Sequence, residues 1–421
     1  MRIAMISYHT CPLATLGGKD TGGMNVYVHE LTRHLGRLGI HVDVFTRSQD
    51  EHIPQVLHDL GYGNRVVHIP AGPEIPLSKP ALTCHLPEFV EGVLSFTEKK
   101  GIGYDLIHSH YWMSGMAATS LRESWNVPII QMFHTLGKMK NRIARNPEEM
   151  EGDYRLEGEQ QVLDAVDRVV VATPAEQEQL ELLYRADPDK LVIIPPGVDT
   201  SHFFPIPTDE SREYIGIDPQ DHMLLFVGRI EPLKGIDTLL KAFALLQEQG
   251  VIRCCDQYLV IIGGNPSGDQ NGMNKEMERL QRMCIEIGIH DLVLFLGQRS
   301  QSSLPYYYSA ADMVVMPSHY ESFGMVALEA MACGTPVVAS QVGGLAYLVK
   351  DGVTGFVVPS DDANALSEQL KRLLLDENLR RRLGRQAAEY AQDYDWAKIT
   401  RQIVALYQDT LEKQPAAQPV R

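Results

Sequence analysis

Short apolar segments alternate with amphipathic segments along the first half of this chain. Strands are predicted near residues 2–9, 41–47, 66–70, 104–110, 128–134, 168–173 and 190–197. A helix is predicted after the first strand, because Val28, Leu31, Leu35 and Leu38 recur at helical spacing. Apolar strands that alternate with helices predict a parallel sheet covered by helices on both faces.

The same pattern begins again in the second half. Further strands are predicted at 222–230, 258–264, 292–297, 312–318, 336–340 and 355–359, with helices at 235–249 and 274–287 between them. The four prolines of residues 195–207 indicate a linker. We therefore predict an α/β protein with two Rossmann-like, doubly wound domains that face each other across a cleft. These domains are 1–197 and 198–398, and a helix in 399–421 is expected to pack back on the first domain and end in a flexible tail.

Composition narrows the class of partner. The 421 residues carry a formal net charge of −16, which disfavours nucleic acid and anionic membranes as partners. No apolar run reaches the roughly 20 residues that a membrane helix needs. The first residues resemble a buried strand more than a signal peptide. The six cysteines have neither disulfide nor metal spacing, so we expect reduced thiols in a cytoplasmic protein.

The strongest chemical signal is the segment ESFGMVALE, which runs from Glu321 to Glu329 after a predicted strand. Eight helical residues span about 12 Å, which is close to the distance between the sugar ring and the ribose of a nucleotide sugar. Glu321 is predicted to hold sugar hydroxyls and Glu329 to accept from the ribose. The helix start between them, with Ser322, Phe323 and Gly324, offers backbone N–H groups to a diphosphate.

A second signal is FVGRIEPLKG, in which Arg229 follows a predicted strand and Lys234 comes five residues later. Two cations at a strand end neutralise the negative charge that builds up on a departing diphosphate. The glycines of residues 17–25 also let backbone N–H groups approach a phosphate. Their spacing is not GxGxxG, which argues against a nicotinamide cofactor.

Over nearly its whole length the chain resembles the family-4 retaining glycosyltransferases of GT-B fold. The stretch from ESFGMVALEAMACGTPVVAS to TGFVV is similar to the donor-binding stretch of that family. The resemblance implies that Arg229 and Lys234 stabilise the leaving diphosphate and that Gly22 and Gly23 touch the donor phosphate. It also implies that His134 lies beneath the transferred sugar and that Asn25 faces the acceptor. No metal and no cofactor is implied.

A set of cations and hydroxyls in the first half predicts a phosphate site for the acceptor. Its members are Lys79, Tyr111, Thr135, Lys138 and Arg155. Three cations, a hydroxyl and a phenol provide the donors that a dianionic phosphate needs. The neighbouring His108 and His110 are interpreted as strand-end residues that face alternate sides of the strand, and not as metal ligands.

The predicted activity is transfer of glucose from UDP-glucose, or ADP-glucose, to a phosphorylated small acceptor. The first reading is fructose 6-phosphate, because sucrose-phosphate synthases carry a cation in the position of Lys138. The alternative is transfer of N-acetylglucosamine from its UDP derivative to inositol 1-phosphate, as in mycothiol synthesis, which GGMNVYV and HSHYW favour. Two other classes stay open: a nucleotide-sugar epimerase, and a phosphosugar-binding protein without activity.

Overall fold

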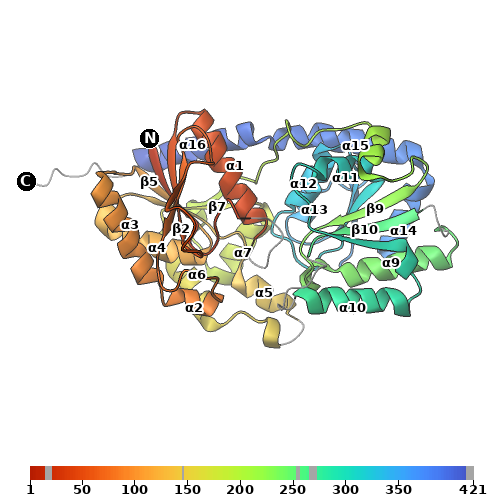
Figure 1. Ribbon diagram of the computed structural model, residues 1–421, viewed down its shortest axis with the longest axis horizontal. Helices are drawn as coiled ribbons and strands as arrows, with labels where there is room; N and C mark the ends of the chain where they lie inside the picture. The colour runs from red at the N-terminus through yellow and green to blue at the C-terminus, as the bar shows by residue number, and fades with distance from the viewer. Residues whose placement is uncertain (15–20, 145–146, 253–256, 265–272, 414–421) are drawn as a thin grey trace, which may run out of the picture. The chain divides into compact units, whose positions relative to one another are not determined.

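The computed structural model describes residues 1–14, 21–144, 147–252, 257–264 and 273–413 (Figure 1). Contacts divide the chain into two compact units. The N-terminal unit contains residues 1–14, 23–195 and 396–421, and the C-terminal unit contains 15–22 and 196–395. The predicted boundaries at 197 and 398 lie within three residues of these divisions. The last part of the predicted tail, 414–421, lies outside the described residues.

The N-terminal unit is built on a sheet of eight strands in the order β3-β4-β2-β1-β5-β6-β7-β8. All neighbouring pairs are parallel except β3 with β4. The strands are β1 (Arg2–Ile6), β2 (His41–Arg47), β3 (Val56–Leu57), β4 (Arg65–Ile69), β5 (Leu106–His110), β6 (Ile129–Met132), β7 (Arg168–Val171) and β8 (Leu191–Ile193). Most of these strands are buried along their length, as expected for a sheet covered on both faces.

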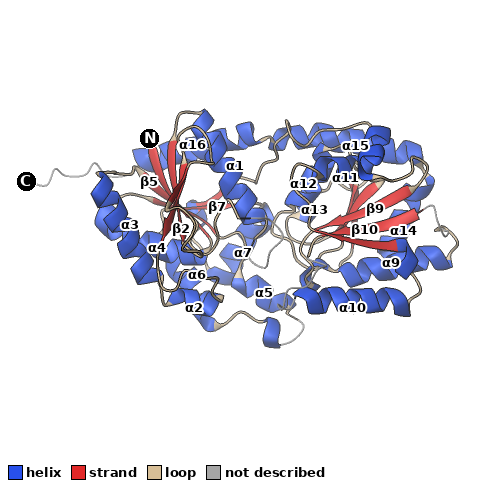
Figure 2. Ribbon diagram, in the orientation of Figure 1, coloured by secondary structure: helices blue, strands red, loops and turns tan. Residues whose placement is uncertain are grey.

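Helices cover both faces of this sheet (Figure 2). They are α1 (Gly23–Arg37), α2 (Lys79–Thr83), α3 (Leu86–Lys100), α4 (Trp112–Trp125), α5 (Gly137–Ile143), α6 (Asp153–Ala165), α7 (Pro174–Tyr184) and α16 (Trp396–Glu412). Val28, Leu31 and Leu35 form the buried stripe of α1, whereas Leu38 lies past the end of the helix and is 49% exposed. The C-terminal helix α16 packs against α1 and places Trp396 beside Tyr27, with ring centroids 5.2 Å apart.

The C-terminal unit contains a second sheet, in which six parallel strands follow the order β11-β10-β9-β12-β13-β14. The strands are β9 (His222–Val227), β10 (Gln257–Ile262), β11 (Val293–Gly297), β12 (Met313–Met316), β13 (Val337–Ser340) and β14 (Gly355–Val358). The helices are α8 (Thr208–Ile215), α9 (Ile236–Glu248), α10 (Met273–Glu286), α11 (Leu304–Ala310), α12 (Met325–Ala332), α13 (Leu345–Leu348), α14 (Ala363–Leu375) and α15 (Glu377–Ala391). Helices α9 and α10 lie on one side of the sheet, and α11 and α12 lie on the other (Figure 2).

Both sheets are doubly wound, so the prediction of two parallel-sheet α/β domains is confirmed. The direction of winding reverses between β1 and β5 in the N-terminal unit, and between β9 and β12 in the C-terminal unit. Ligands of open α/β sheets bind beyond the carboxyl ends of strands at such points. The fold therefore directs attention to the residues that follow these four strands. Among the described residues, no helix is both long enough and apolar enough to cross a bilayer.

Candidate active site

In the C-terminal unit, the loops after β9 and β12 bring an ion pair together. Lys234 lies in the loop after β9, and its Nζ is 2.5 Å from Oε2 of Glu321, which follows β12. Gly235 makes this approach possible. Its φ is +63°, and a Cβ on it would stand 2.1 Å from the carbonyl oxygen of Pro317. Only glycine fits this contact between the two loops.

The backbone of Glu321 is held by the glycine pair at 343–344. The amide of Gly344 donates to the Glu321 carbonyl at 2.9 Å. Gly343 has φ +43°, and a Cβ there would be 2.0 Å from the same oxygen. Helix α12 begins directly after Gly324, whose φ of +105° suits glycine. Ser322, Phe323 and Gly324 thus lead into a helix whose first amides have no intrahelical acceptor, which favours an anion.

Arg229 follows β9 directly, at the point where the winding reverses. Its Nη1 lies 2.9 Å from Oε1 of Glu231, and its side chain is 36% exposed. Gly22 belongs to the C-terminal unit, and a Cβ on it would be 3.9 Å from Nε of Arg229. Gly23 begins α1 in the N-terminal unit, and the glycines at 17 and 18 lie outside the described residues. Arg229 and Lys234 thus both lie in the loop after β9, and Glu321 lies in the loop after the neighbouring strand β12.

Glu329 is buried on α12 and is paired with a tyrosine that sequence reasoning missed. Its Oε2 accepts a hydrogen bond from Tyr308 Oη at 2.7 Å. Burial raises the pKa of Glu329 to about 7, although the bond from Tyr308 works in the opposite direction. Because Tyr308 precedes β12 on α11, the contact depends on how two helices pack, and no local motif marks it.

In the N-terminal unit, four of the five residues predicted to hold a phosphate lie close together. Tyr111 follows β5, and its ring lies 5.6 Å from Lys79 Nζ and 5.1 Å from the Arg155 guanidinium carbon. The Nη2 of Arg155 donates to Thr135 Oγ1 at 3.0 Å and to its carbonyl at 3.1 Å. Tyr111 has φ +74° and ψ 154°, which is a costly backbone conformation for any residue other than glycine. Such strain is typical of functional sites.

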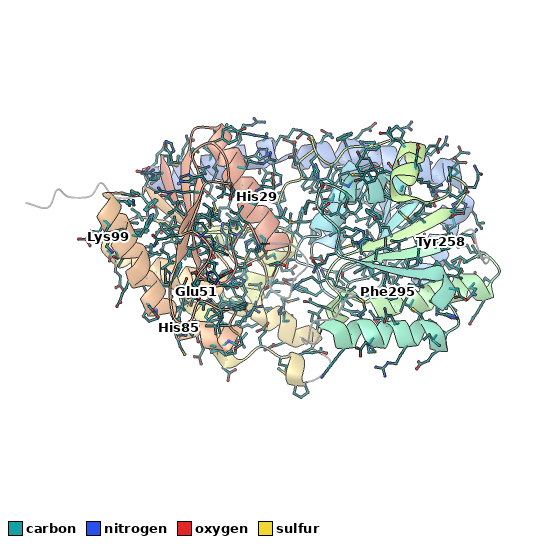
Figure 3. All side chains as sticks on the ribbon, viewed as in Figure 1. His29, Glu51, His85, Lys99, Tyr258 and Phe295 are labelled. Carbon is teal, nitrogen blue, oxygen red and sulfur yellow. The ribbon has the colours of Figure 1, made fainter. Side chains whose placement is uncertain are left out.

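The loop that precedes Lys79 is tied to the sheet by Arg47. This buried guanidinium, at the end of β2, donates to three carbonyl oxygens of the loop, those of Ala71, Pro73 and Ile75. Gly72 lies in the same loop with φ +66°, and a Cβ on it would meet the His85 ring at 2.3 Å. His85, labelled in Figure 3, stands between α2 and α3. Lys79 therefore begins α2 from a fixed position.

The side chain of Lys138 does not lie with the other four residues, contrary to the sequence prediction. Its Nζ donates to the Leu183 carbonyl at 2.7 Å and lies 4.1 Å from the centre of the Tyr184 ring. The ammonium group is therefore bound at the end of α7. Lys140 takes the place expected of Lys138, because its Nζ lies 2.8 Å from Glu151 and interacts electrostatically with Arg155 and Lys79. Residues two apart on a helix point in different directions, and the side of α5 that faces the cluster was not marked in the sequence.

Arg155 is buried and doubly paired. Its Nε donates to Glu159 at 2.8 Å, and its Nη1 donates to Glu151 at 2.6 Å. Glu159 in turn accepts from the Gly137 amide and the Tyr184 hydroxyl. Burial works against the charge of Arg155, but Tyr111, Glu159 and Glu151 raise its pKa above the usual value. The arginine is therefore a fixed cation, and Glu151 and Glu159 are its counter-ions.

Three buried histidines of the same unit lie close together, and one prediction about them is wrong. His108 and His110 are both on β5, and their rings are 4.4 Å apart on the same face. Residues i and i+2 of a strand share a face, so they do not face alternate sides. Nδ1 of His110 lies 3.0 Å from Nε2 of His134, and Nδ1 of His108 lies 2.7 Å from Tyr407 Oη on α16. Burial lowers the pKa of His108 and of His134 to about 3, so these rings are neutral.

Asn25 is buried near the start of α1. Its Nδ2 donates to Thr10 Oγ1 and to the Cys11 carbonyl, both at 2.7 Å. These two acceptors belong to the loop after β1, which is the strand next to the reversal of winding. Asn25 thus fixes that loop, and an acceptor-binding role for it remains a prediction.

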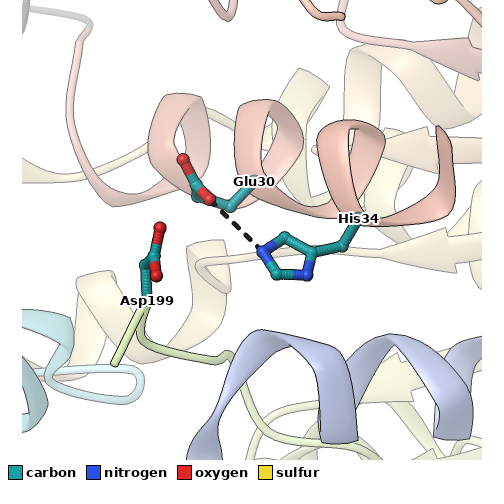
Figure 4. Close-up of side chains that lie close together, drawn as sticks. All are labelled: Glu30, His34 and Asp199. Atoms are coloured by element: carbon teal, nitrogen blue, oxygen red, sulfur yellow. Dashed lines mark ion pairs between the residues drawn. The ribbon is translucent and has the colours of Figure 1, made fainter. Parts of the chain in front are cut away.

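A further polar cluster on α1 is an ion-pair network. Glu30 Oε2 accepts from Arg33 at 2.5 Å. The same oxygen lies 3.8 Å from Nε2 of His34, one turn along the helix (Figure 4). Burial opposes the charge of Glu30, but hydrogen bonds from His29 and Arg33 lower its pKa. Asp199, also drawn in Figure 4, belongs to the other unit. Because an arginine already neutralises Glu30, this cluster does not fit a metal ion.

Comparison with known proteins agrees with this architecture. Residues 21–202 match the family described as Glycosyltransferase Family 4, and residues 207–390 match Glycosyl transferases group 1. The two doubly wound sheets and these matches define a glycosyltransferase of the GT-B class. The chain belongs to the family-4 glycosyltransferases.

Two curated relatives cover nearly all of the chain. D-inositol 3-phosphate glycosyltransferase of Actinosynnema mirum is 41% identical over 96% of this chain and 96% of its own length. D-inositol 3-phosphate glycosyltransferase 2 of Catenulispora acidiphila is 42% identical over 98% of this chain and 95% of its own length. Among solved structures, a sucrose-phosphate synthase from Thermosynechococcus elongatus superposes with a TM-score of 0.90 at 35% identity, over 98% of this chain and 100% of that one.

The prediction of fructose 6-phosphate as the acceptor is contradicted by these relatives. The curated proteins that match at 41–42% identity over the whole chain are named for inositol phosphate, and their identity exceeds that of the sucrose-phosphate synthase. The cation on which the first reading rested, Lys138, is also directed to Leu183 and Tyr184. The findings therefore favour the inositol-phosphate alternative.

Proposed function

We propose that this protein transfers a sugar from a UDP-sugar to a hydroxyl group of an inositol monophosphate. The observation that carries the proposal is the grouping of three cations, a phenol and a hydroxyl in the N-terminal unit, provided by Lys79, Lys140, Arg155, Tyr111 and Thr135. The relatives at 41–42% identity are named for inositol phosphate, and for this reason we take inositol as the polyol of the acceptor. The donor sugar is N-acetylglucosamine, as the resemblance to the mycothiol enzymes implies.

The acceptor phosphate would bind where the cluster offers its donors. Lys79 contributes a point charge and Tyr111 a hydroxyl group, whose oxygen is buried and has no partner among the described residues. Arg155 is held from behind by Glu159, so it cannot turn away from the phosphate without leaving a buried carboxylate unpaired. Fixed donors of this kind orient the polyol and thereby select which hydroxyl group reacts.

The nucleotide sugar would bind the C-terminal unit. Arg229, Lys234 and the first amides of α12 face the diphosphate, and Glu321 accepts from sugar hydroxyls. Glu329 accepts from the ribose. Reaction breaks the bond between the anomeric carbon and the diphosphate oxygen and forms a bond to the acceptor oxygen. The acceptor proton moves to the departing phosphate, with retention at the anomeric carbon, as the family resemblance implies.

A matrix of donors and acceptors tests this proposal. UDP release is measured with UDP-glucose or UDP-N-acetylglucosamine, each with inositol 3-phosphate, fructose 6-phosphate, free inositol or no acceptor. We expect release that depends on inositol 3-phosphate. Release that requires fructose 6-phosphate would contradict the proposal. Epimerised donor without an acceptor would indicate the epimerase class, and tight acceptor binding without release would indicate a binding protein.

Variants of the donor group extend the test. Arg229→Ala and Glu321→Ala should each lower UDP release at least about 100-fold, because each removes a contact to the charge or the sugar of the transition state. Arg381→Ala and Glu377→Ala remove an exposed ion pair of the same unit and should leave the rate unchanged. Full activity of either donor-group variant would remove the support for this donor site.

A further inference from the structure

Glu151 lies between two cations of the acceptor group. A single oxygen, Oε1, accepts from Arg155 Nη1 at 2.6 Å and from Lys140 Nζ at 2.8 Å. Phosphate oxygens make the same contacts with arginine and lysine when proteins bind them. The carboxylate of Glu151 thus has the partners that an acceptor phosphate would take.

The backbone of Glu151 is fixed by one asparagine. Asn141 Oδ1 accepts from the Glu151 amide at 2.6 Å, and Asn141 Nδ2 donates to the Glu151 carbonyl at 3.0 Å. The backbone N–H and C=O of Glu151 are thus both hydrogen-bonded to a side chain of α5, the helix that also carries Lys140. The carboxylate is therefore held in place from the same element as one of its partners.

The charge state of Glu151 follows from its neighbours. Burial works against the ionised form, but Arg155, Lys140 and Lys79 outweigh burial and lower its pKa. The carboxylate is accordingly ionised at neutral pH. The three cations of the group face two anions, Glu151 and the deeply buried Glu159, which leaves one net positive charge for an incoming anion.

The two carboxylates differ in how tightly they are held. Glu159 is buried and accepts from Gly137 and Tyr184 as well as from Arg155, so its removal would leave several donors unpaired. Glu151 has a side chain that is 16% exposed, and within the described part of the chain its carboxylate is hydrogen-bonded to the two cations alone. Of the five N–H donors of Arg155, one goes to Glu159, two point to Thr135 and one goes to Glu151. The bond to Glu151 is the one that an incoming anion exchanges most easily.

We infer that Glu151 is a specificity-determining residue that competes with anions for the acceptor phosphate site. This inference rests on the proposed function, because it takes the cluster to be the place where the acceptor phosphate binds. A dianionic phosphate that is also held through its polyol displaces the carboxylate from Lys140 and Arg155. An inorganic phosphate ion lacks the polyol contacts, so the carboxylate keeps it out.

Binding of inorganic phosphate to three full-length proteins tests this inference. Isothermal titration calorimetry compares the wild type, Glu151→Gln and Glu157→Gln. Glu157 is an exposed glutamate of α6, the helix that begins two residues after Glu151, so its variant has the same change in charge away from the cluster. We expect Glu151→Gln to bind phosphate at least about tenfold more tightly than the wild type, because a like charge next to the ligand is removed. Glu157→Gln should match the wild type.

Equal or weaker phosphate binding by Glu151→Gln would overturn the inference and would assign the residue a purely structural role. Glu151→Asp provides a second variant that keeps the charge and shortens the side chain by one methylene. It should bind phosphate more tightly than the wild type but less tightly than Glu151→Gln, and an affinity at or below that of the wild type would count against competition. Thermal unfolding of each variant establishes that the protein is folded.

The probe separates this inference from the proposed function. Inorganic phosphate has no polyol, so tighter binding by Glu151→Gln supports competition whichever acceptor the wild type uses. Failure of inositol 3-phosphate as an acceptor would refute the proposed function and leave that result standing. Activity with inositol 3-phosphate, together with unchanged phosphate affinity in Glu151→Gln, would refute the competition alone.

Discussion

Replacing Lys140 or Lys138 by methionine, in separate variants, compares two lysines of the short helix α5. Methionine keeps most of the length of the side chain and removes the charge. Lys140 is paired with Glu151 in the acceptor group, whereas Lys138 is bound to the Leu183 carbonyl. The two variants have the same change in net charge and lie two residues apart, so each is the control for the other.

The expected magnitude follows from the contacts. Lys140→Met deletes one charged donor of the phosphate site and leaves Glu151 less neutralised. Hydrogen bonds to charged groups contribute about 1.5–3 kcal/mol, which corresponds to a rise of about 10- to 100-fold in the acceptor KM. The lysine side chain is 25% exposed, so solvent screening favours the lower half of that range.

Lys138→Met should behave differently. It removes a hydrogen bond to a carbonyl and a cation–π contact with Tyr184, so the free energy of unfolding should fall by about 1–2 kcal/mol. The acceptor KM should change less than about twofold, because the ammonium group is directed away from the site. Steady-state UDP release gives KM, and urea unfolding gives stability. An acceptor KM that rises as much in Lys138→Met as in Lys140→Met would refute this reasoning.

Three further predictions concern buried groups. Glu159→Ala should lower the free energy of unfolding in urea by about 3–5 kcal/mol, since it removes the buried counter-ion of Arg155 Nε and leaves the Gly137 amide and the Tyr184 hydroxyl without their acceptor, and a loss below about 1 kcal/mol would contradict this. Burial raises the pKa of Glu329 to about 7, so ionisation of this carboxyl destabilises the folded state as pH rises through that value. The free energy of unfolding in urea should therefore decline by about 1–1.5 kcal/mol between pH 6 and 8 in the wild type, and Glu329→Gln should lack this decline. Nε2 of His110 is buried without a partner among the described residues, which favours a proton on its Nδ1 donated to His134. Nitrogen NMR of labelled histidines should therefore show His134 protonated at Nδ1, and a proton on its Nε2 would contradict the assignment.

Much of the fold was predictable because buried parallel strands are continuous apolar runs. The runs at 104–110 and 312–318, for example, contain β5 and β12. The two-residue strand β3 was missed, since it pairs antiparallel at the sheet edge and has too few residues to show a pattern. Leu38 was placed on the helix face by its spacing, yet the chain leaves the helix at Arg37.

The site was predictable where it depends on position after a strand. Arg229, Glu321 and Tyr111 all follow strands at the points where the winding reverses, and the sequence marks strand ends well. The direction of side chains on short helices was not predictable, as Lys138 shows. Contacts such as that of Glu329 with Tyr308 join separate helices, so no local spacing reports them.

The acceptor was wrongly predicted for a related reason. Lys79, Thr135 and Arg155 were predicted to bind a phosphate, and fructose 6-phosphate and inositol phosphate both carry one. A single cation, Lys138, decided the first reading, and its ammonium group points to Leu183.

A competition between two acceptors tests whether this family-4 glycosyltransferase acts on an inositol phosphate. The most direct measurement is a competition in which UDP-N-acetylglucosamine reacts with equal concentrations of inositol 3-phosphate and fructose 6-phosphate, and mass spectrometry counts both products. The product ratio equals the ratio of kcat/KM for the two acceptors. The account predicts a ratio above about 100 in favour of the inositol product, because the wrong acceptor leaves buried polar groups unpaired. A ratio near or below one would contradict it.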